Sequence, residues 1–247
     1  MPAAFYTKWP AYLRGLFSFV LPQNCPLCQS FVTSTGLCSD CWHGLRPIAA
    51  PSCAACGRPL AYALLHSLCA PCLVKPFKAS KIRSGYCYDD SSRKLILPFK
   101  HADRLDIAPV MAVMIAAPFD ALAETADLLI PVPLHPARYL KRRYNQSAEL
   151  ARWLCRNRPA GIEFAPHLLV RVKATPSMAG LSKSRREQNV RRAFQLASPA
   201  VKTELAGKNI LLIDDVMTTG ATLNSCTQTL LEAGAQSVSA LVFARVV

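Results

Sequence analysis

Eight of the eleven cysteines form four C-x-x-C pairs, all of them within residues 25–72. A C-x-x-C turn places two thiolates on the same side of a metal ion, and two such turns complete a tetrahedral shell of four sulfurs. The four pairs therefore predict two structural zinc sites, which would hold together a segment too short to build a core of its own. The expected ligands are Cys25, Cys28, Cys38, Cys41, Cys53, Cys56, Cys69 and Cys72.

Other chemistry fits these cysteines less well. Disulfides are typical of exported proteins, and the apolar run at residues 11–21 meets Pro22 without the small-residue cleavage site of a secretory signal. A redox protein would carry one C-x-x-C beside a βαβ unit, and the usual spacing of iron–sulfur ligation is absent. Sequential and crossed pairing of the four turns both remain open. The remaining candidates, expected to lie outside the metal sites, are His43, His66, Cys87, Cys155 and Cys226.

Two adjacent carboxylates form a second candidate site. Asp214 and Asp215 follow the apolar run at residues 209–213, and the small residues at 216–222 lead into an amphipathic run. Backbone N–H groups at the start of a helix attract anions, and the threonine hydroxyls of this turn add further donors. Carboxylates beside an anion cradle suit a sugar phosphate, whose hydroxyls donate to the carboxylates.

A nucleotide hydrolase is the main alternative for this stretch, because its Walker B strand also ends in acidic residues. Such an enzyme needs a G-x-x-x-x-G-K-[ST] loop. The nearest approach is Gly207-Lys208, but Lys202 stands where the first glycine belongs and Asn209 follows the lysine. The hydrolase interpretation therefore fails, whereas an ordinary strand, loop and helix with surface aspartates stays open.

The elements around these residues predict an α/β protein. Apolar runs alternate with longer amphipathic runs after about residue 79, which is typical of a mostly parallel, doubly wound sheet. Ligands of such sheets bind at the carboxyl ends of the strands, where the two aspartates are expected. We expect strands at residues 82–88, 128–132, 167–171, 209–213 and 238–244 and helices near 105–116, 145–156 and 222–233, the last ending at Gly234.

The charge balance indicates anionic partners. The chain of 247 residues has a formal net charge of +14, and residues 135–192 contribute +11 of it. Two zinc sites with four thiolates each would lower the net charge to about +10. Phosphorylated small molecules and nucleic acid both fit a basic protein. The apolar run at residues 107–119 is too short to cross a bilayer, so we expect a cytoplasmic protein with no membrane span.

The stretch ILLIDDVMTTGAT at residues 210–222 resembles the phosphoribosyl pyrophosphate (PRPP) signature of type I phosphoribosyltransferases. Residues 95–104, 131–151 and 175–194 resemble the ComF family, in which cysteine knuckles precede such a domain. The resemblance implies a type I phosphoribosyltransferase-like sheet preceded by a small zinc-ribbon domain. The implied domains are a lead segment at residues 1–22, a double zinc ribbon at 23–78 and the phosphoribosyltransferase-like domain at 79–247.

The resemblance also implies roles for individual residues. Asp214 and Asp215 would hold the ribose hydroxyls of Mg²⁺-PRPP and serve as the catalytic carboxylates, and residues 217–222 would hold the 5′-phosphate. The basic stretch at residues 181–192 corresponds to a mobile loop of type I enzymes, although a helix with a basic face fits it too. The full set of expected PRPP ligands is Asp214, Asp215, Met217, Thr218, Thr219, Gly220, Ala221, Thr222, Arg138, Arg142, Arg143 and Arg186.

Two departures from the family pattern fall in the expected ligand loops. Met178 stands in place of glutamine, and Arg143-Tyr144 replaces the Gly-Phe of an R-G-F-N-Q block. At the end of that block, Asn145 or Ser147 is expected to cap the next helix.

The resemblance favours a role in DNA uptake or related DNA handling, with other competence proteins as partners. Single-stranded DNA would then be held by basic residues and stacked aromatic rings. The alternatives are a nucleobase-salvage phosphoribosyltransferase and a scaffold that senses PRPP without turnover. No residue stands out as a base for an acceptor. The aromatic candidates are Trp42, Tyr139, Tyr144 and Trp153, of which Trp153 also fits a core position.

Overall fold

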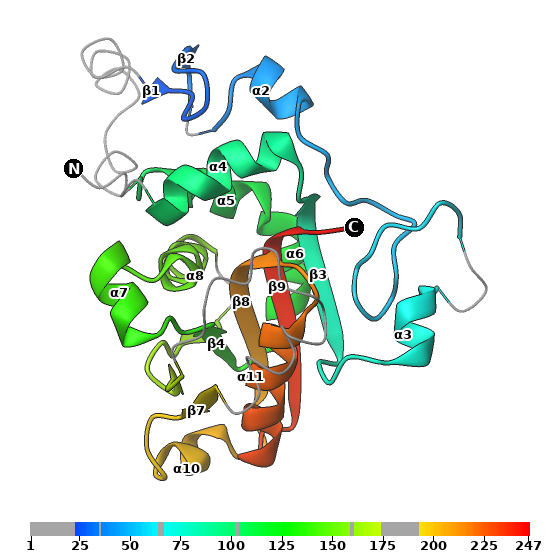
Figure 1. Cartoon of the computed structure of the whole chain (residues 1–247), viewed down its shortest axis with the longest axis vertical. Coiled ribbons are helices and arrows are strands. Elements are labelled where there is room, and N and C mark those ends of the chain that lie inside the picture. The colour runs from blue at the N-terminus through cyan, green and yellow to red at the C-terminus, as the bar shows by residue number, and fades with distance from the viewer. Residues whose placement is uncertain (1–22, 35, 64–66, 102–103, 159–160, 174–192) are drawn as a thin grey trace. The chain divides into compact units, whose positions relative to one another are not determined.

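The computed structural model describes residues 23–34, 36–63, 67–101, 104–158, 161–173 and 193–247 (Figure 1). The expectations for the lead segment, His66, Met178, Arg186 and the rest of the basic stretch at residues 181–192 lie outside these ranges. The chain forms two compact units, Met1–Gly44 and Leu45–Val247. The first and second pairs of cysteine knuckles therefore belong to different units.

The smaller unit is built around two short turns. Strands β1 (Gln23–Asn24) and β2 (Phe31–Val32) pair in antiparallel fashion, and the turn between them carries the first knuckle. Helix α2 (Ser39–His43) begins directly after Cys38, so the second knuckle lies in its first turn. No described residue of α2 is buried, and metal ligation by the two turns would hold them together.

The larger unit contains a five-stranded sheet in the order β3-β9-β8-β4-β5, with every neighbouring pair parallel. The expected mostly parallel α/β fold is therefore confirmed. Near-continuous burial in β4, β8 and β9 explains their unbroken apolar sequences, because a parallel sheet is covered on both faces. The strands are β3 (Lys81–Cys87), β4 (Leu128–Pro131), β5 (Glu163–Phe164), β8 (Asn209–Met217) and β9 (Ser237–Arg245).

Helices cover both faces of this sheet (Figure 1). Helix α8 (Gln146–Asn157) packs against β4 and β8, and α6 (Ala116–Ala123) packs against β3 and β9. Helix α11 (Ala221–Glu232) contributes Leu223 and Leu230 to a core shared with Ile130 and Leu212. The other helices are α3 (Ala70–Val74), α4 (Asp90–His101), α5 (Ile107–Met114), α7 (Pro136–Arg142) and α10 (Val201–Leu205).

Strands β5 and β7 (Phe194–Leu196) were not predicted, and β8 and β6 (Leu169–Arg171) differ from the sequence prediction. Strand β8 continues through Asp214 and Asp215 to Met217, because its ladder with β9 runs as far as Arg245. The two carboxylates therefore lie within the second half of a strand, and the turn begins at Thr218. Strand β6 falls where a sheet strand was expected, but it pairs in antiparallel fashion with β7 outside the central sheet.

The expected helices near residues 105–116, 145–156 and 222–233 are present as α5, α8 and α11. Asn145 caps α8, and its side chain accepts a hydrogen bond from the Ser147 amide. Gly234 adopts φ +102° directly after α11, as a helix stop requires. Sequence reasoning missed α2, α3, α4, α6, α7 and α10. Among the described residues, no helix is long and apolar enough to cross a membrane.

Candidate functional site

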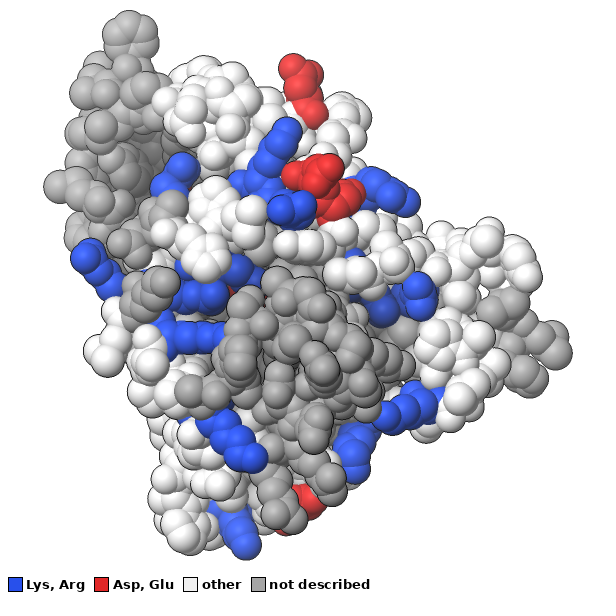
Figure 2. Space-filling model, viewed as in Figure 1, with Lys and Arg blue, Asp and Glu red and all other residues white. Residues whose placement is uncertain are grey.

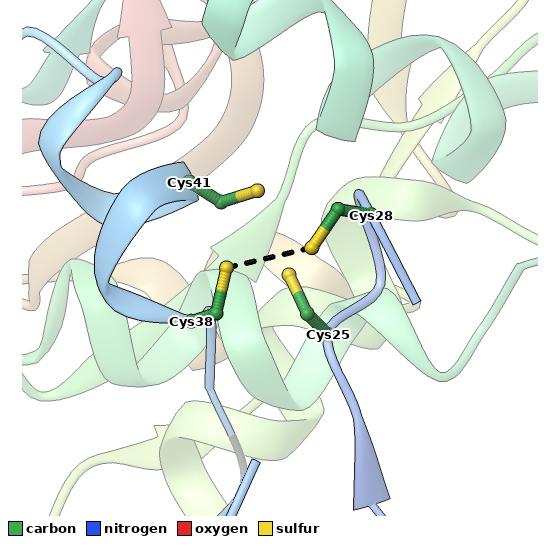
Figure 3. Close-up of side chains that lie close together, drawn as sticks. All are labelled: Cys25, Cys28, Cys38 and Cys41. Atoms are coloured by element: carbon green, nitrogen blue, oxygen red, sulfur yellow. Dashed lines mark hydrogen bonds between the residues drawn. The ribbon is translucent and has the colours of Figure 1, made fainter. Parts of the chain in front are cut away.

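The first cysteine cluster brings together Cys25, Cys28, Cys38 and Cys41 (Figure 3). All four sulfurs lie within 4.8 Å of one another, and those of Cys28 and Cys38 are 3.4 Å apart. Cys25 is buried, whereas Cys28 is exposed and the other two are half-buried. Burial alone would raise the pKa of Cys25, but hydrogen bonds from nearby backbone amides lower it overall, which favours the thiolate.

The second cluster brings together Cys53, Cys56, Cys69 and Cys72, all of them buried. Burial opposes ionisation of Cys53, yet hydrogen bonds from backbone amides, including that of Cys69, lower its pKa to about 6. Ala55, Leu60, Leu68 and Phe77 pack around the sulfurs. This cluster is therefore the centre of a small core.

Both clusters fit zinc. A Zn–S bond of about 2.3 Å places tetrahedral ligands roughly 3.8 Å apart, in keeping with groups whose sulfurs all lie within 4.8 Å. The pairing is sequential, so the structure selects one of the two arrangements that the sequence left open. Nδ1 of His43 lies 2.7 Å from the Ser39 carbonyl oxygen and the ring joins neither cluster, as predicted. Cys87 and Cys226 are buried core residues, also as predicted, and Cys155 is half-buried.

The second cluster lies against the edge of the central sheet. The amides of Ile82 and Cys87 in β3 donate to the carbonyls of Ala55 and Arg46. The chain before and within the second ribbon therefore covers this edge, which removes an unpaired strand edge from solvent. Backbone hydrogen bonds thus connect the second ribbon to strand β3 of the sheet.

The carboxylates of Asp214 and Asp215 have different partners. The Ser147 hydroxyl and the Asp215 amide both donate to Oδ1 of Asp214, at 3.0 and 2.9 Å. Asp215 forms an ion pair with Lys100, whose Nζ lies 2.9 Å from Oδ1. Helices α8 and α4 therefore each supply one side chain to the end of β8.

The environment of Asp214 disfavours its charge. Burial, and next the negative charge of Asp215, raise the pKa of Asp214 to about 7, although Lys100 and the Ser147 hydrogen bond act in the opposite direction. The protonated form of Asp214 is therefore favoured relative to that of an exposed aspartate.

The loop after β8 forms a small pocket, lined by Asp214 and residues 216–223. Gly220 adopts φ +76° at the start of α11, in the left-handed region that favours glycine. The first-turn amides of a helix suit an anion, and α11 is twelve residues long; the Ala221 amide also donates to the Thr219 hydroxyl at 3.4 Å. The loop thus places donors beside the carboxylate of Asp214.

Two of the expected basic ligands, Arg138 and Arg142, interact with each other, and Arg138 also acts on Arg171. Burial, and next the charge of Arg142, lower the pKa of Arg138. Burial is the largest cause that lowers the pKa of Arg171, and the positive charge of Arg138 lowers it further. The negative charge of Asp214 raises the pKa of Arg171. The guanidinium of Arg171 lies over the ring of Phe194, at 5.3 Å. Of these arginines, Arg171 interacts with Asp214, and Arg142 donates to the Gln146 side chain at 3.1 Å.

The Arg143-Tyr144 pair has a structural explanation. Arg143 ends α7 with φ +63°, a conformation that glycine adopts without strain, and its side chain is exposed. Tyr144 is buried, donates to the Phe99 carbonyl and lies against the Phe99 ring. The suggestion that Tyr144 stacks on DNA is therefore wrong, because its ring is part of the core.

Sequence reasoning missed Lys100 and Arg171. Lys100 follows the buried positions Leu95, Ile96 and Phe99 of α4, whose i, i+1, i+4 spacing marks one face of a helix. Arg171 lies in β6, buried among apolar neighbours, although arginine is seldom buried without a charged or polar role. The signal for both was a basic residue at the end of an apolar run.

Two parts of the chain match known family models. Residues 16–73 match the model of the double zinc ribbon domain, and residues 159–246 match that of the phosphoribosyl transferase domain. Competence protein F of Haemophilus influenzae is 32% identical over 223 residues, or 87% of this chain and 92% of that protein. DNA utilization protein YhgH of Salmonella typhimurium is 31% identical, covering 88% and 95%. Competence protein ComFC of Bacillus subtilis is 29% identical, covering 85% and 84%.

Proposed function

Because the chain belongs to the ComF family, we propose that it binds PRPP at residues 214–222 and acts in DNA uptake or related DNA handling. One observation carries the proposal: two carboxyl groups at the end of β8 adjoin a loop with a left-handed glycine at the start of α11. We further propose a functional division at residue 79. Residues 23–78 would hold zinc and residues 79–247 the sugar phosphate.

In this proposal, Asp214 and Asp215 accept hydrogen bonds from the ribose hydroxyls, and the loop amides donate to the 5′-phosphate. Lys100 keeps Asp215 oriented and balances its charge. Arg138 and Arg142 supply positive charge toward the pyrophosphate. Mg²⁺, bound with the ligand, would neutralise part of the pyrophosphate charge.

Turnover would break the bond between the ribose C1 and pyrophosphate, and the positive charge that develops on the ribose would be stabilised by the two carboxylates. A salvage phosphoribosyltransferase and a PRPP-sensing scaffold would use the same site. Release of pyrophosphate with one particular base supports salvage, whereas binding without release supports sensing.

DNA handling is supported by the names of the relatives, two of which are competence proteins and one a DNA utilization protein. The net charge of +14 suits a polyanion. Figure 2 shows lysine and arginine side chains spread over the described part of one face, with few carboxylates between them. Trp42 and Tyr139 are 46% and 51% exposed, and exposed aromatic rings are the side chains on which single-stranded bases stack.

The test is a calorimetric titration of Mg²⁺-PRPP into the zinc-loaded protein and into the Asp214→Asn/Asp215→Asn variant. We expect saturable binding to the first and none to the second. Asp127→Asn is the matched control, because Asp127 lies beyond the opposite end of β8 and accepts from the Asn209 amide through an oxygen that asparagine retains. Equal binding to all three proteins would contradict the proposed site.

The DNA arm is tested by single-strand binding at several salt concentrations. Affinity should fall steeply as salt rises, because phosphate contacts release counterions. Binding that is absent at low salt would remove DNA from the proposal and leave the PRPP site intact.

A further inference from the structure

Phe77 joins the second cysteine cluster to the sugar-phosphate loop. Its ring packs against the core formed by Cys53, Cys56, Cys69 and Cys72. The same ring covers Gly220, where an added Cβ would lie 2.3 Å from Cε1 of Phe77. A single side chain thus contacts both the metal-binding core and the glycine that shapes the loop.

The residue after Phe77 adds a polar contact. The Lys78 amide donates to Oδ1 of Asn224 at 3.0 Å, in the first turn of α11. Asn224 in turn has its own amide bonded to the Gly220 carbonyl at 2.9 Å. The segment that leaves the second cluster is therefore hydrogen-bonded to the helix whose first amides line the loop.

A second connection reaches the other end of the loop. Arg245 is buried at the end of β9, and its guanidinium donates to the Cys56 carbonyl. Arg245 pairs in register with Met217, the last residue of β8, and the next amide, that of Val246, donates to the Met217 carbonyl at 2.9 Å. The second ribbon is thus tied to the loop both where it begins, at Met217, and where it ends, at Gly220.

We propose that the second zinc ribbon is a positioning element of the sugar-phosphate loop, with Phe77 and Arg245 as the positioning residues. Zinc bound by the second cluster then sets the order of residues 217–223, and through it the affinity for a phosphorylated sugar. The ligand in this statement rests on the proposed function, whereas the order of the loop does not.

The physical reason is that the second ribbon has little core other than its metal ligands. The buried members of its cluster are the four cysteines, and Ala55, Leu60, Leu68 and Phe77 are only partly buried against them. In such small segments metal binding supplies the folding free energy. Without zinc, the Phe77 ring loses the surface that holds it against Gly220.

Hydrogen–deuterium exchange of residues 217–223 tests the positioning without any ligand. We expect faster exchange in Phe77→Ala and in Cys56→Ser, and no change in Cys28→Ser, which removes a ligand of the first cluster. Phe77→Leu keeps an apolar side chain and should fall between wild type and Phe77→Ala. Tyr62→Ala is the matched control, since Tyr62 belongs to the same ribbon but is 69% exposed.

Zinc content identifies what each variant has lost. Phe77→Ala keeps all eight ligands, so it is expected to retain two zinc ions per chain while its loop exchanges faster. Unchanged exchange in both Phe77→Ala and Cys56→Ser would overturn the proposal. So would equal acceleration in Phe77→Ala and Tyr62→Ala.

PRPP titration then separates the two proposals. Where wild type binds PRPP, we expect Phe77→Ala to bind roughly tenfold more weakly, within the range typical of coupled sites. Where wild type binds no PRPP, the proposed ligand is wrong, and the exchange result alone decides whether the ribbon positions the loop. PRPP affinity unchanged in Phe77→Ala would overturn the coupling even if the loop exchanged faster.

Discussion

The two cysteine clusters have the same ligands and the same kind of spacing, yet they lie in different settings. The first belongs to a small unit, and Cys28 is open to solvent. The second is buried and shares backbone hydrogen bonds with strand β3 of the larger unit. A repeated metal motif can therefore hold a local turn at one position and complete the edge of a sheet at another.

The largest expected difference is in stability. Cys56→Ser should lower the free energy of unfolding of the larger unit by several kcal/mol, because this cluster is bonded to the sheet. Cys28→Ser should change it by less than about 0.5 kcal/mol. Denaturant unfolding followed by far-UV circular dichroism measures both, with Cys155→Ser as the control for loss of an isolated cysteine. Equal losses in the two cluster variants would remove the distinction.

The rate of zinc loss sharpens the same comparison. A chelating dye should take up zinc in two phases, because the first cluster has an exposed ligand and the second has none. Cys28→Ser should abolish the fast phase and leave the slow phase unchanged. Loss of both zinc ions from wild type in a single phase would mean that the burial of the cysteines does not control the access of the chelator to the metal.

The pH dependence of PRPP binding is expected to belong to the larger unit alone. Affinity should rise between pH 6 and 8, because Asp214, whose pKa is raised to about 7, accepts a hydrogen bond from a ribose hydroxyl more strongly once it has lost its proton. Lys100→Met should move this rise to higher pH, since Lys100 lowers the pKa of Asp214. Calorimetry at a series of pH values measures the profile, which should be the same in Cys28→Ser.

The same proton affects stability with a defined sign. The folded pKa of Asp214 is raised from 3.8 to about 7, so the unfolded chain releases this proton at lower pH. The larger unit should therefore lose stability as the pH rises from 3.8 to about 7. Asp214→Asn should remove this contribution to the dependence of stability on pH. A slope that is unchanged in the asparagine variant would contradict the assignment.

The smallest expected effect concerns Arg143. Arg143→Gly should stabilise the larger unit by about 1 kcal/mol, because glycine adopts the left-handed conformation at φ +63° without strain. Thermal unfolding measures the gain, and Arg142→Gly, at the last residue of helix α7, is the contrasting variant that should destabilise, because it loses the hydrogen bond to Gln146 and the higher helix propensity of arginine. A loss of stability in Arg143→Gly would indicate that its exposed side chain outweighs the backbone strain.

Local patterns made much of this site predictable. Metal knuckles, the Asp214-Asp215 pair and Gly220 each depend on neighbours a few residues away, so their spacing reveals them. The parallel sheet followed from the apolar runs. Cys226 and Cys87 could be assigned to the core because apolar residues surround them in sequence.

What the sequence did not reveal depends on contacts between distant segments. Lys100 of α4 forms an ion pair with Asp215 of β8, and Phe77 packs against Gly220, more than a hundred residues away in the sequence. Charged residues inside an apolar run suggested that β8 ended before Asp214, whereas pairing with β9 extends it. Strand β6 matched the pattern of a sheet strand, but pairing with β7 removes it from the sheet.

Titration of Mg²⁺-PRPP into Cys28→Ser and Cys56→Ser tests the central claim most directly, because each variant removes one ligand from one of two chemically equivalent clusters. The account predicts wild-type affinity in Cys28→Ser and weak or absent binding in Cys56→Ser. Equal affinity in the two variants would contradict it, since the second cluster would then affect PRPP binding no more than the first.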